Sequence, residues 1–197
     1  FQRLLSDYPA ATLHETIPHF HDTPKRFRDF HAALEADIAG RRNTAEKEIA
    51  FYLAQEPLSG AITDEIARGN IPLRVTHNDT KLNNIMMDEK TDQAVCVIDL
   101  DTVMPGSALY DFGDSIRFGA SSGAEDEQDV DKIFMRLDLF QSYTAGYLEE
   151  AKTALTEAEI ARLPMSAILM TLECGVRFLT DYLNGDTYFQ TGYPTHN

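Results

Sequence analysis

The amino-acid sequence predicts a mostly helical α+β fold in which short β-hairpins carry one loop rich in polar side chains. Apolar residues recur at helical spacing in residues 24–68 and again in residues 129–183. Residues 71–101 instead form short runs rich in β-branched and other apolar residues, separated by turn signals. The strands are grouped together and do not alternate with helices. This order is typical of α+β proteins and not of a doubly wound parallel sheet.

Length and composition predict one domain over residues 1–197, because 43% apolar residues suffice for a core. The 32 acidic residues outnumber the 17 Lys and Arg residues, and the net charge of −15 argues against nucleic acid and anionic membranes as partners. No apolar run reaches about 18 residues, and the first residues do not resemble an export signal. Cys96 and Cys174 lie in apolar patterns and are expected to be buried, reduced thiols. These features predict a cytoplasmic protein.

Three helices are expected before the strands. The first covers residues 24–39, with Thr23 as its N-cap and Gly40 as its stop. Its apolar stripe consists of Phe27, Phe30, Leu34 and Ile38. A second helix is expected over residues 44–55, and a short third one over residues 62–68.

The central part of the chain predicts short strands over residues 73–76, 84–87 and 94–101. The polar run at 88–92 is expected to form a hairpin turn between the second and third of these strands. Residues 104–110 contain Pro and Gly and are expected to form a loop. The strands therefore brace the polar loop that lies between the first and the second.

Two longer helices are expected in the last third, over residues 129–150 and 157–183. A shorter segment over residues 112–118 precedes them. The second long helix is apolar nearly all round, and Glu173 and Arg177 are the only charges between residues 163 and 179. A helix of this kind is expected to be buried in the core.

Three polar residues match the order and spacing of a kinase catalytic loop and its metal-binding aspartate: Asp79, Asn84 and Asp99. Asp79 would accept or orient the proton of an attacking hydroxyl group. Asn84 and Asp99 would supply oxygen ligands to Mg²⁺. Taken singly, each also fits a structural role, as a turn residue or a strand-end cap. Asp99 closes an apolar run. A carboxylate near a core is costly without a partner, so a bound metal ion explains Asp99 better than a strand-end cap does.

The run Asp111-Phe112-Gly113 spells the magnesium motif of protein kinases, but it follows an expected loop. Asp99 ends a strand nearer to the polar loop, so the metal is assigned to Asp99. Asp111 is expected to have a structural role instead, either by hydrogen-bonding the backbone of the polar loop or by capping the segment after it. Asp101 lies on the same strand face as Asp99 and could support it.

These residues resemble those of the aminoglycoside phosphotransferase and choline kinase family, whose fold is similar to that of the protein kinases. The resemblance is carried by His77-Asn-Asp79, Asn84, Val97-Ile-Asp99 and Tyr110-Asp111. Longer runs are closer still to the N-acetylhexosamine 1-kinases. These runs are 76–84, 115–119, 177–183 and 185–189, and the likeness covers most of residues 71–193.

The resemblance implies ATP as co-substrate, Mg²⁺ as metal and the anomeric hydroxyl of N-acetylglucosamine or N-acetylgalactosamine as acceptor. It also implies that Phe118 and Arg177 line the sugar site, although Phe118 could be plain core and Arg177 could pair with Glu173. Lys81 occupies a position at which several protein kinases contact the transferred phosphate; otherwise it is a solvated loop lysine. His77 is expected to support the loop.

Such kinases also need a glycine-rich loop and a Lys–Glu pair in an N-terminal lobe, and residues 1–70 resemble neither. The chain is therefore expected to be a C-terminal catalytic lobe, inactive by itself, whose partner is the N-terminal lobe of the full-length protein. Two alternatives stay open. One is a kinase for another small molecule, such as choline, an aminoglycoside or a homoserine-like alcohol, and the other is a lobe kept for binding without catalysis.

Overall fold

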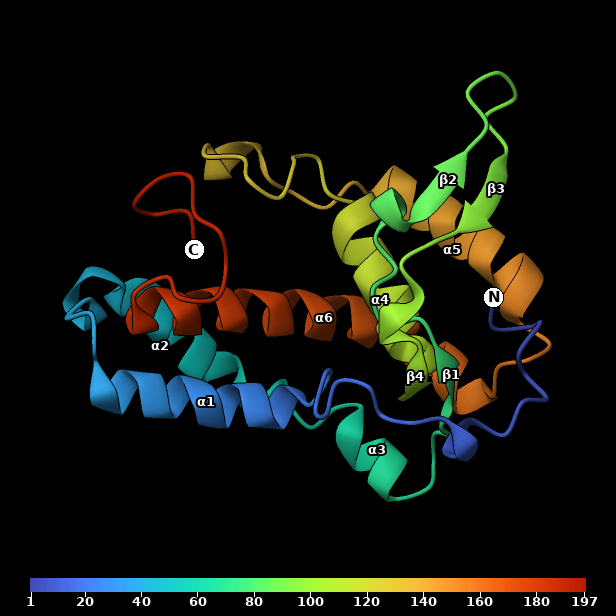
Figure 1. Ribbon diagram of the computed structural model, residues 1–197, viewed down its shortest axis with the longest axis horizontal. Helices are drawn as coiled ribbons and strands as arrows, with labels where there is room; N and C mark the ends of the chain where they lie inside the picture. Colours follow the sequence, from blue (N-terminus) through green and yellow to red (C-terminus); the bar gives the residue numbers. More distant parts are fainter.

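The longest helix, α6 (Glu157–Asn184), runs through the centre of the computed structural model, which describes all 197 residues. Figure 1 shows α1 lying along one side of α6 and α4 meeting its N-terminal half. A capping box begins α6, since Thr156 Oγ1 accepts from the Glu159 backbone N–H and Glu159 accepts from that of Thr156. The helix ends at Gly185, whose φ of 92° is left-handed and favours glycine.

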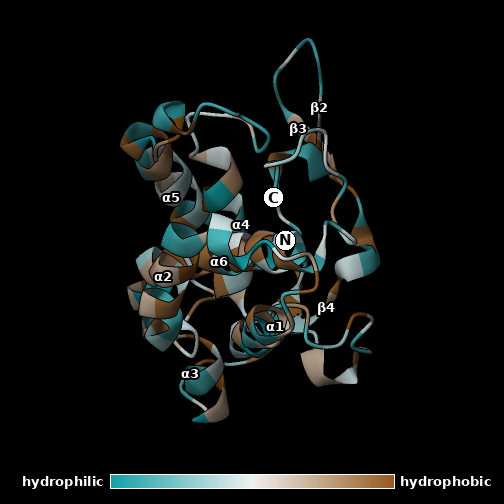
Figure 2. Cartoon of the chain, turned by 90° about the vertical axis from the view of Figure 1, so that its left-hand side faces the viewer, coloured by the Kyte–Doolittle hydropathy of each residue, from teal (hydrophilic) through white to brown (hydrophobic).

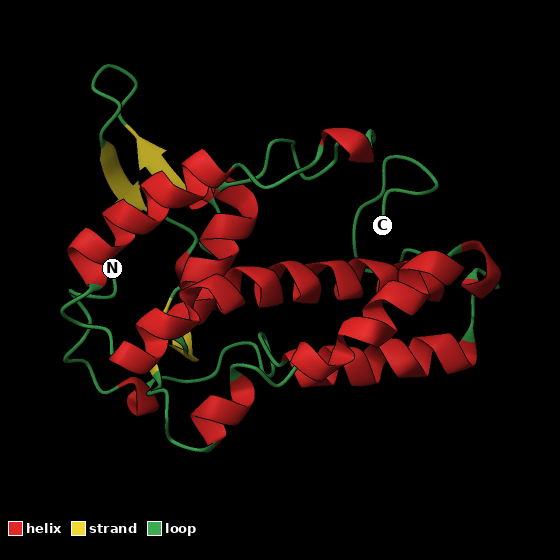
Figure 3. Ribbon diagram, turned by 180° about the vertical axis from the view of Figure 1, so that it is seen from behind, coloured by secondary structure: helices red, strands yellow, loops and turns green.

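The remaining helices are α1 (Thr23–Ala36), α2 (Glu46–Gln55), α3 (Thr63–Ala67), α4 (Ala108–Gly119) and α5 (Leu137–Ala151). Together with four short strands they confirm the α+β class and the helical character of this lobe (Figure 3). Residues 129–136 are not part of α5, contrary to the prediction of a helix from residue 129. That segment has one 3₁₀ turn, and its apolar residues Val130 and Ile133 are exposed.

The ends of α1 differ from the prediction. Asp22, and not Thr23, is the N-cap, because the Asp22 carboxylate accepts from the Lys25 backbone N–H at 2.9 Å. Thr23 is the first helical residue, and its hydroxyl points to α6 instead. The helix ends at Asp37 in a left-handed conformation, which leaves Ile38 outside the helix and 75% exposed.

The strands form two separate antiparallel pairs. β1 (Arg74–Thr76) pairs with β4 (Met104–Gly106), and β2 (Ile85–Met87) pairs with β3 (Ala94–Val97). The prediction of a loop over residues 104–110 was therefore wrong, since its first part is β4 and its last part begins α4. Pairing between segments so far apart in sequence leaves no local signal. A side chain at Gly106 would clash with Thr76, because an added Cβ would lie 2.2 Å from the Thr76 hydroxyl.

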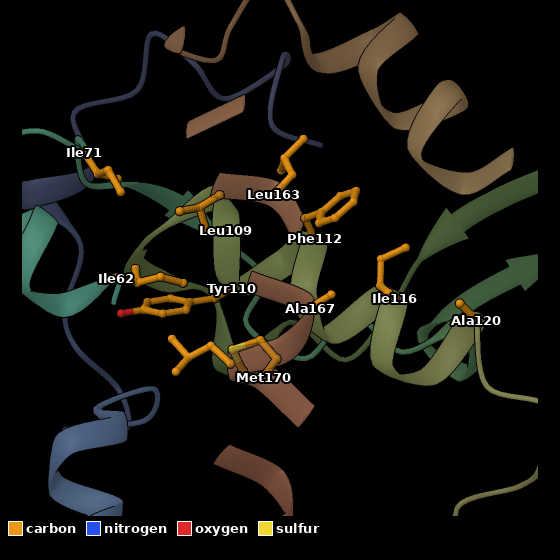
Figure 4. Packing of buried hydrophobic residues seen from close by; sticks show 11 residues of the cluster. Ile62, Ile71, Leu109, Tyr110, Phe112, Ile116, Ala120, Leu163, Ala167 and Met170 are labelled. Carbon is orange, nitrogen blue, oxygen red and sulfur yellow. The ribbon is translucent and has the colours of Figure 1, made fainter. Parts of the chain in front are cut away.

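The core contains two large clusters that meet on α6, and a third cluster of 3 buried residues lies beside them. Figure 4 shows the first cluster, in which α4 packs against α6. Its members on these two helices are Leu109, Tyr110, Phe112, Ile116, Leu163, Ala167, Leu169 and Met170. The two helices touch at Gly113, where a Cβ would lie 2.4 Å from the Ser166 carbonyl oxygen. The second cluster joins the far half of α6 to α1 and α2. The expectation that the segment 163–179 lies in the core is confirmed.

By length and composition alone α6 could also cross a membrane, although half of its most apolar window is buried inside the protein. The buried half packs on α4 and α1, as expected of a core helix.

The β2–β3 hairpin projects from the helices and ends in a hydrophilic tip (Figure 2). Every residue of β3 is exposed, so the expectation that Cys96 is buried was wrong. Cys174 is half-buried, and both thiols are free.

Candidate active site

Three of the predicted site residues meet in the loop between β1 and β2. Asn84 donates from its amide Nδ2 to both the backbone oxygen and the carboxylate Oδ2 of Asp79, each at 2.9 Å. Lys81 Nζ lies 3.4 Å from the same carboxylate oxygen. The Asp79 side chain is 26% exposed and can therefore be reached from solvent. Because the nitrogen of the Asn84 amide is directed at Asp79, its oxygen is the atom available to a cation.

Asp111 lies beneath this loop and holds its backbone. The carboxylate accepts from the backbone N–H groups of His77 at 3.1 Å and Asn78 at 2.8 Å, and from Gln2 Nε2 at 2.7 Å. Burial raises the pKa of Asp111, and these three donors oppose that effect. Hydrogen bonding to the backbone of the loop is one of the two structural roles expected for Asp111.

A second brace from α4 holds Thr80, which follows Asp79. The Thr80 backbone N–H donates to Asp114 Oδ2 at 2.9 Å, and its hydroxyl donates to the Asp111 backbone oxygen at 2.6 Å. Ser115 Oγ donates to the Thr80 backbone oxygen at 3.0 Å. The sequence analysis missed Asp114 and Ser115. Their spacing of three and four residues from Asp111 places all three on one helix face, which is a readable signal once a helix is assigned there.

His77 links the loop to the segment that carries Asp99. Its Nε2 lies 3.0 Å from the Ile98 carbonyl oxygen, and its Nδ1 accepts from the Asp79 backbone N–H at 3.3 Å. These two partners match a His77 tautomer that carries its proton on Nε2. The Thr102 hydroxyl also donates to the His77 backbone oxygen at 2.6 Å.

Asp99 follows β3 in a left-handed conformation with φ of 62°, and its side chain is exposed. The expectation of a carboxylate near a core was therefore wrong, since β3 is exposed along its whole length. A hydrogen bond to Asp101 and the negative charge of that residue raise the pKa of Asp99, and Asp79 adds to the effect while Lys81 opposes it. A cation would relieve this repulsion among carboxylates. No three His, Cys, Asp or Glu side chains form a preassembled metal cluster.

Arg177 forms no direct ion pair with Glu173, although its positive charge helps to lower the pKa of the Glu173 carboxyl group. Glu173 instead accepts from Thr23 Oγ1 at 2.5 Å and contacts His21 at 2.7 Å. The Arg177 guanidinium lies 5.5 Å from the centre of the Phe189 ring. Together these two residues line a cavity of about 340 Å³. Its other lining residues include Phe20, Arg26, Asp181 and Tyr188.

Phe118 is half-buried near the end of α4 and does not line this cavity.

The turn after α6 forms part of the cavity wall. Asp181 accepts from three successive backbone N–H groups, those of Thr187, Tyr188 and Phe189, each at 2.9 Å. A buried carboxylate thus fixes the two aromatic side chains at the cavity. Asp181 has no sequence signature that would distinguish it from other helix-end aspartates.

The loop carboxylate of Asp79, held by an amide and placed beside a lysine, is chemically suited to orient a hydroxyl group and accept its proton. A family model described as "Phosphotransferase enzyme family" matches residues 5–149 of the chain. The chain belongs to this family and is a phosphotransferase. The matched range contains the polar loop, Asp99 and Asp111, and it ends within α5, so Arg177 lies beyond it.

Proposed function

We propose that this chain is the catalytic lobe, over residues 1–197, of a kinase that transfers the γ-phosphate of ATP to the anomeric hydroxyl of an N-acetylhexosamine. The observation that carries the proposal is the carboxylate of Asp79, held by Asn84 and Lys81 on a loop that α4 braces. Phosphoryl transfer requires positioning and electrostatic stabilisation more than covalent chemistry from the protein. A rigidly held carboxylate meets the first of these needs.

In the proposed reaction the sugar hydroxyl oxygen forms a bond to the γ-phosphorus as the bond from that phosphorus to the β-phosphate oxygen breaks. Asp79 accepts the hydroxyl proton, and ADP leaves. Lys81 Nζ lies 3.4 Å from Asp79 Oδ2, and in this proposal it contacts the transferred phosphoryl group. The Asn84 amide keeps the carboxylate pointing in one direction.

Asn84 and Asp99 are the residues that would hold Mg²⁺, and the ion would supply positive charge against the phosphates during phosphoryl transfer. The donor set suits a hard cation, since it offers one amide oxygen and one carboxylate beside two further carboxylates, Asp79 and Asp101. The raised pKa of Asp99 beside Asp101 supports this assignment, because a group that repels its neighbours gains most from a cation. Mg²⁺ is usually held by one or two protein groups and completes its octahedron from phosphates and water.

The cavity lined by Arg177 is the proposed acceptor site. Its volume of about 340 Å³ is at the lower end of the range usual for small-molecule sites, which suits a monosaccharide. The Tyr188 and Phe189 rings can pack against the apolar face of a sugar, and the guanidinium can donate to hydroxyl or acetamido oxygens. Arg177 follows Glu173 by one turn of α6, and Glu173 is joined through His21 to the loop. Phe118 is retained as a proposed sugar contact on the resemblance alone.

Nucleotide binding needs a lobe that covers the phosphates. Residues 1–70 form helices, 3₁₀ turns and loops and contain no strand. We therefore expect the glycine-rich loop and the Lys–Glu pair to come from an N-terminal lobe of the full-length protein.

A kinase for a cationic acceptor, such as choline or an aminoglycoside, is the second candidate, and the net charge of −15 favours it. ADP release by the full-length protein, measured with ATP and Mg²⁺ against N-acetylhexosamines, choline, aminoglycosides and homoserine, decides between the two. We expect turnover with an N-acetylhexosamine that falls by about 10² to 10⁴ in Asp79→Asn. Turnover with a cationic acceptor alone would replace the sugar assignment, and none with any acceptor would favour a binding lobe.

A further inference from the structure

Two histidines far apart in sequence form hydrogen bonds to the same peptide unit. His21 Nε2 lies 2.9 Å from the Asn78 carbonyl oxygen. On the other edge of this unit, the Asp79 backbone N–H donates to His77 Nδ1 at 3.3 Å. The peptide unit between Asn78 and Asp79 is therefore fixed through both of its polar groups. It directly precedes the residue proposed to accept the substrate proton.

The conformation held in this way is an unusual one. Asn78 has φ of 67°, in the left-handed region that non-glycine residues seldom adopt. Such a conformation persists only when its surroundings determine it fully. Asn78 receives further contacts through its side chain, which donates to the Thr102 backbone oxygen at 2.9 Å and accepts from the Thr76 hydroxyl at 2.9 Å. The carbonyl of Asn78, however, has His21 as its hydrogen-bond partner.

The partners of His21 determine its protonation state. Its Nε2 faces a carbonyl oxygen, and its Nδ1 lies 2.7 Å from Glu173 Oε1. A carbonyl oxygen and an ionised carboxylate oxygen only accept hydrogen bonds, so with Glu173 ionised both ring nitrogens carry protons and the ring is an imidazolium. The two side chains are almost fully buried, with 8% of His21 and 1% of Glu173 exposed. Thr23 donates to the second carboxylate oxygen of Glu173 at 2.5 Å.

The charged groups around His21 agree with this assignment. Burial favours the neutral ring, but the Glu173 carboxylate on α6 outweighs it, so the pKa of His21 is raised, and Asp114 on α4 adds to the effect. Burial likewise opposes ionisation of Glu173, yet the charge of His21 lowers the pKa of that carboxyl group. The Tyr110 ring of α4 lies 4.9 Å from the His21 ring, and Asp22 directly follows His21 in sequence.

We propose that His21 is a positioning residue for phosphoryl transfer: its imidazolium, anchored on Glu173, fixes the peptide unit between Asn78 and Asp79 and thereby the direction of the Asp79 carboxylate. The proposal rests on the proposed function, because it assigns the direction of Asp79 a role in the reaction. A buried ion pair is weak support for stability, since desolvation offsets much of its attraction. Its contact with the backbone of the loop gives this pair a use in orientation instead.

The test uses the full-length protein with His21→Phe and His21→Gln. Phenylalanine keeps a ring beside Tyr110 and removes both donors, whereas glutamine restores one N–H donor. We expect His21→Phe to lower kcat about tenfold to a hundredfold, since a misplacement of about 1 Å can cost that much. The KM for the sugar and for ATP should change less than about twofold, because neither binding site is touched. His21→Gln should recover part of the lost kcat.

His31→Gln is the matched control. His31 also pairs with a glutamate, Glu56, through Nε2 at 2.9 Å, but it is half exposed on α1 and touches no part of the loop. This variant should retain the kcat of the unaltered protein. A loss of kcat in His31→Gln equal to that in His21→Phe would overturn the proposal.

A second measurement does not depend on activity. We expect the Asp79 amide to exchange its hydrogen at least about tenfold faster in His21→Phe, by nuclear magnetic resonance, because its peptide unit is released on one edge. Faster exchange in a protein that phosphorylates none of the tested acceptors would show that His21 holds the peptide unit but would refute the proposed function, and with it a role in phosphoryl transfer. Unchanged exchange, with or without a loss of kcat, would refute the positioning role.

Discussion

At the scale of single residues, the candidate site separates the group that acts from the groups that hold it. Asp79 is partly exposed and contacts Asn84 and Lys81, whereas Asp111 is buried and binds the loop backbone. Both are aspartates in motifs that a kinase comparison would flag. Their surroundings distinguish them, since a carboxylate whose oxygens are occupied by backbone donors is a support and an accessible one can meet a substrate.

The first prediction concerns Asp79→Asn in the full-length protein. The amide can keep the geometry of the loop but cannot accept a proton, so kcat should fall by about 10² to 10⁴ while the affinity for Mg·ATP is retained. Steady-state kinetics and calorimetry measure the two quantities. Asp131→Asn, on an exposed aspartate outside the loop, is the control. A loss of less than about tenfold would assign the proton to another group.

The second prediction compares Asp99→Ala with Asp111→Ala. Removing Asp99 should abolish Mg²⁺-dependent ATP binding, measured by calorimetry, and leave the circular dichroism spectrum unchanged. Removing Asp111 leaves two backbone N–H groups of the loop without their acceptor, so the melting temperature should fall, by an amount that corresponds to about 1 to 3 kcal/mol. The opposite pattern would mean that the two aspartates exchange roles.

At the scale of elements, α4 and α6 place the site. The first turns of α4 carry Asp111, Asp114 and Ser115, all directed at the loop. Gly113 on the other face lets α4 approach the backbone of α6 closely. The same helix therefore packs on the core by one side and braces the loop by the other. α6 contributes Glu173 in the middle and Arg177 one turn later.

The third prediction concerns Arg177→Met. Methionine keeps much of the side-chain volume and removes the guanidinium donors, so the KM for the sugar should rise about tenfold or more, as expected for a lost hydrogen bond to a charged group. The KM for ATP should stay the same. Arg42→Met, on an exposed arginine in the turn before α2, is the control. An equal rise of both KM values would point to a structural role for Arg177.

At the scale of the whole molecule, one buried ion pair joins three distant parts of the chain. His21 precedes α1, Glu173 lies within α6, and Asn78 belongs to the loop. Their contacts make the position of the loop depend on the packing of the two long helices. The pair also makes the stability of the molecule depend on pH.

The fourth prediction follows from the signs of the two pKa shifts. The raised pKa of His21 stabilises the fold below its ordinary value of 6.5, and this contribution is lost as the pH rises through the raised value. The lowered pKa of Glu173 stabilises the fold above its ordinary value of 4.5, and this contribution is lost as the pH falls through the lowered value. The contribution of the pair is therefore fully present only between these two ordinary values.

Glu173→Gln removes the pair with little change in volume. We expect the free energy of unfolding in urea to fall by about 1 to 3 kcal/mol between the two ordinary pKa values, and by less at more acid and more alkaline pH. A difference between the two proteins that is constant from pH 4 to pH 9 would mean that the pair is not ionised.

The sequence alone determined the fold class, the helices with strong periodicity and the residues of the polar loop. Periodicity is local, and so is the spacing of a catalytic loop, so both can be read from neighbouring residues. The family match supports the reading of the loop at the level of a phosphotransferase. The N-cap of α1 shows the limit of prediction from local sequence. Asp22 and Thr23 are adjacent and both are polar, and only the placement of the helix shows that Asp22 is the cap.

Only the tertiary structure decided what joins segments far apart in the chain. The pairing of β1 with β4 turned an expected loop into a strand, and the solvent on both sides of β3 exposed Cys96 and Asp99. The tertiary structure also paired Glu173 with His21 and not with Arg177, although Arg177 is closer to Glu173 in sequence. The physical reason is the same in each case: strand pairing, burial and a buried charge are satisfied by partners that packing brings together, and no local pattern records which partners those are.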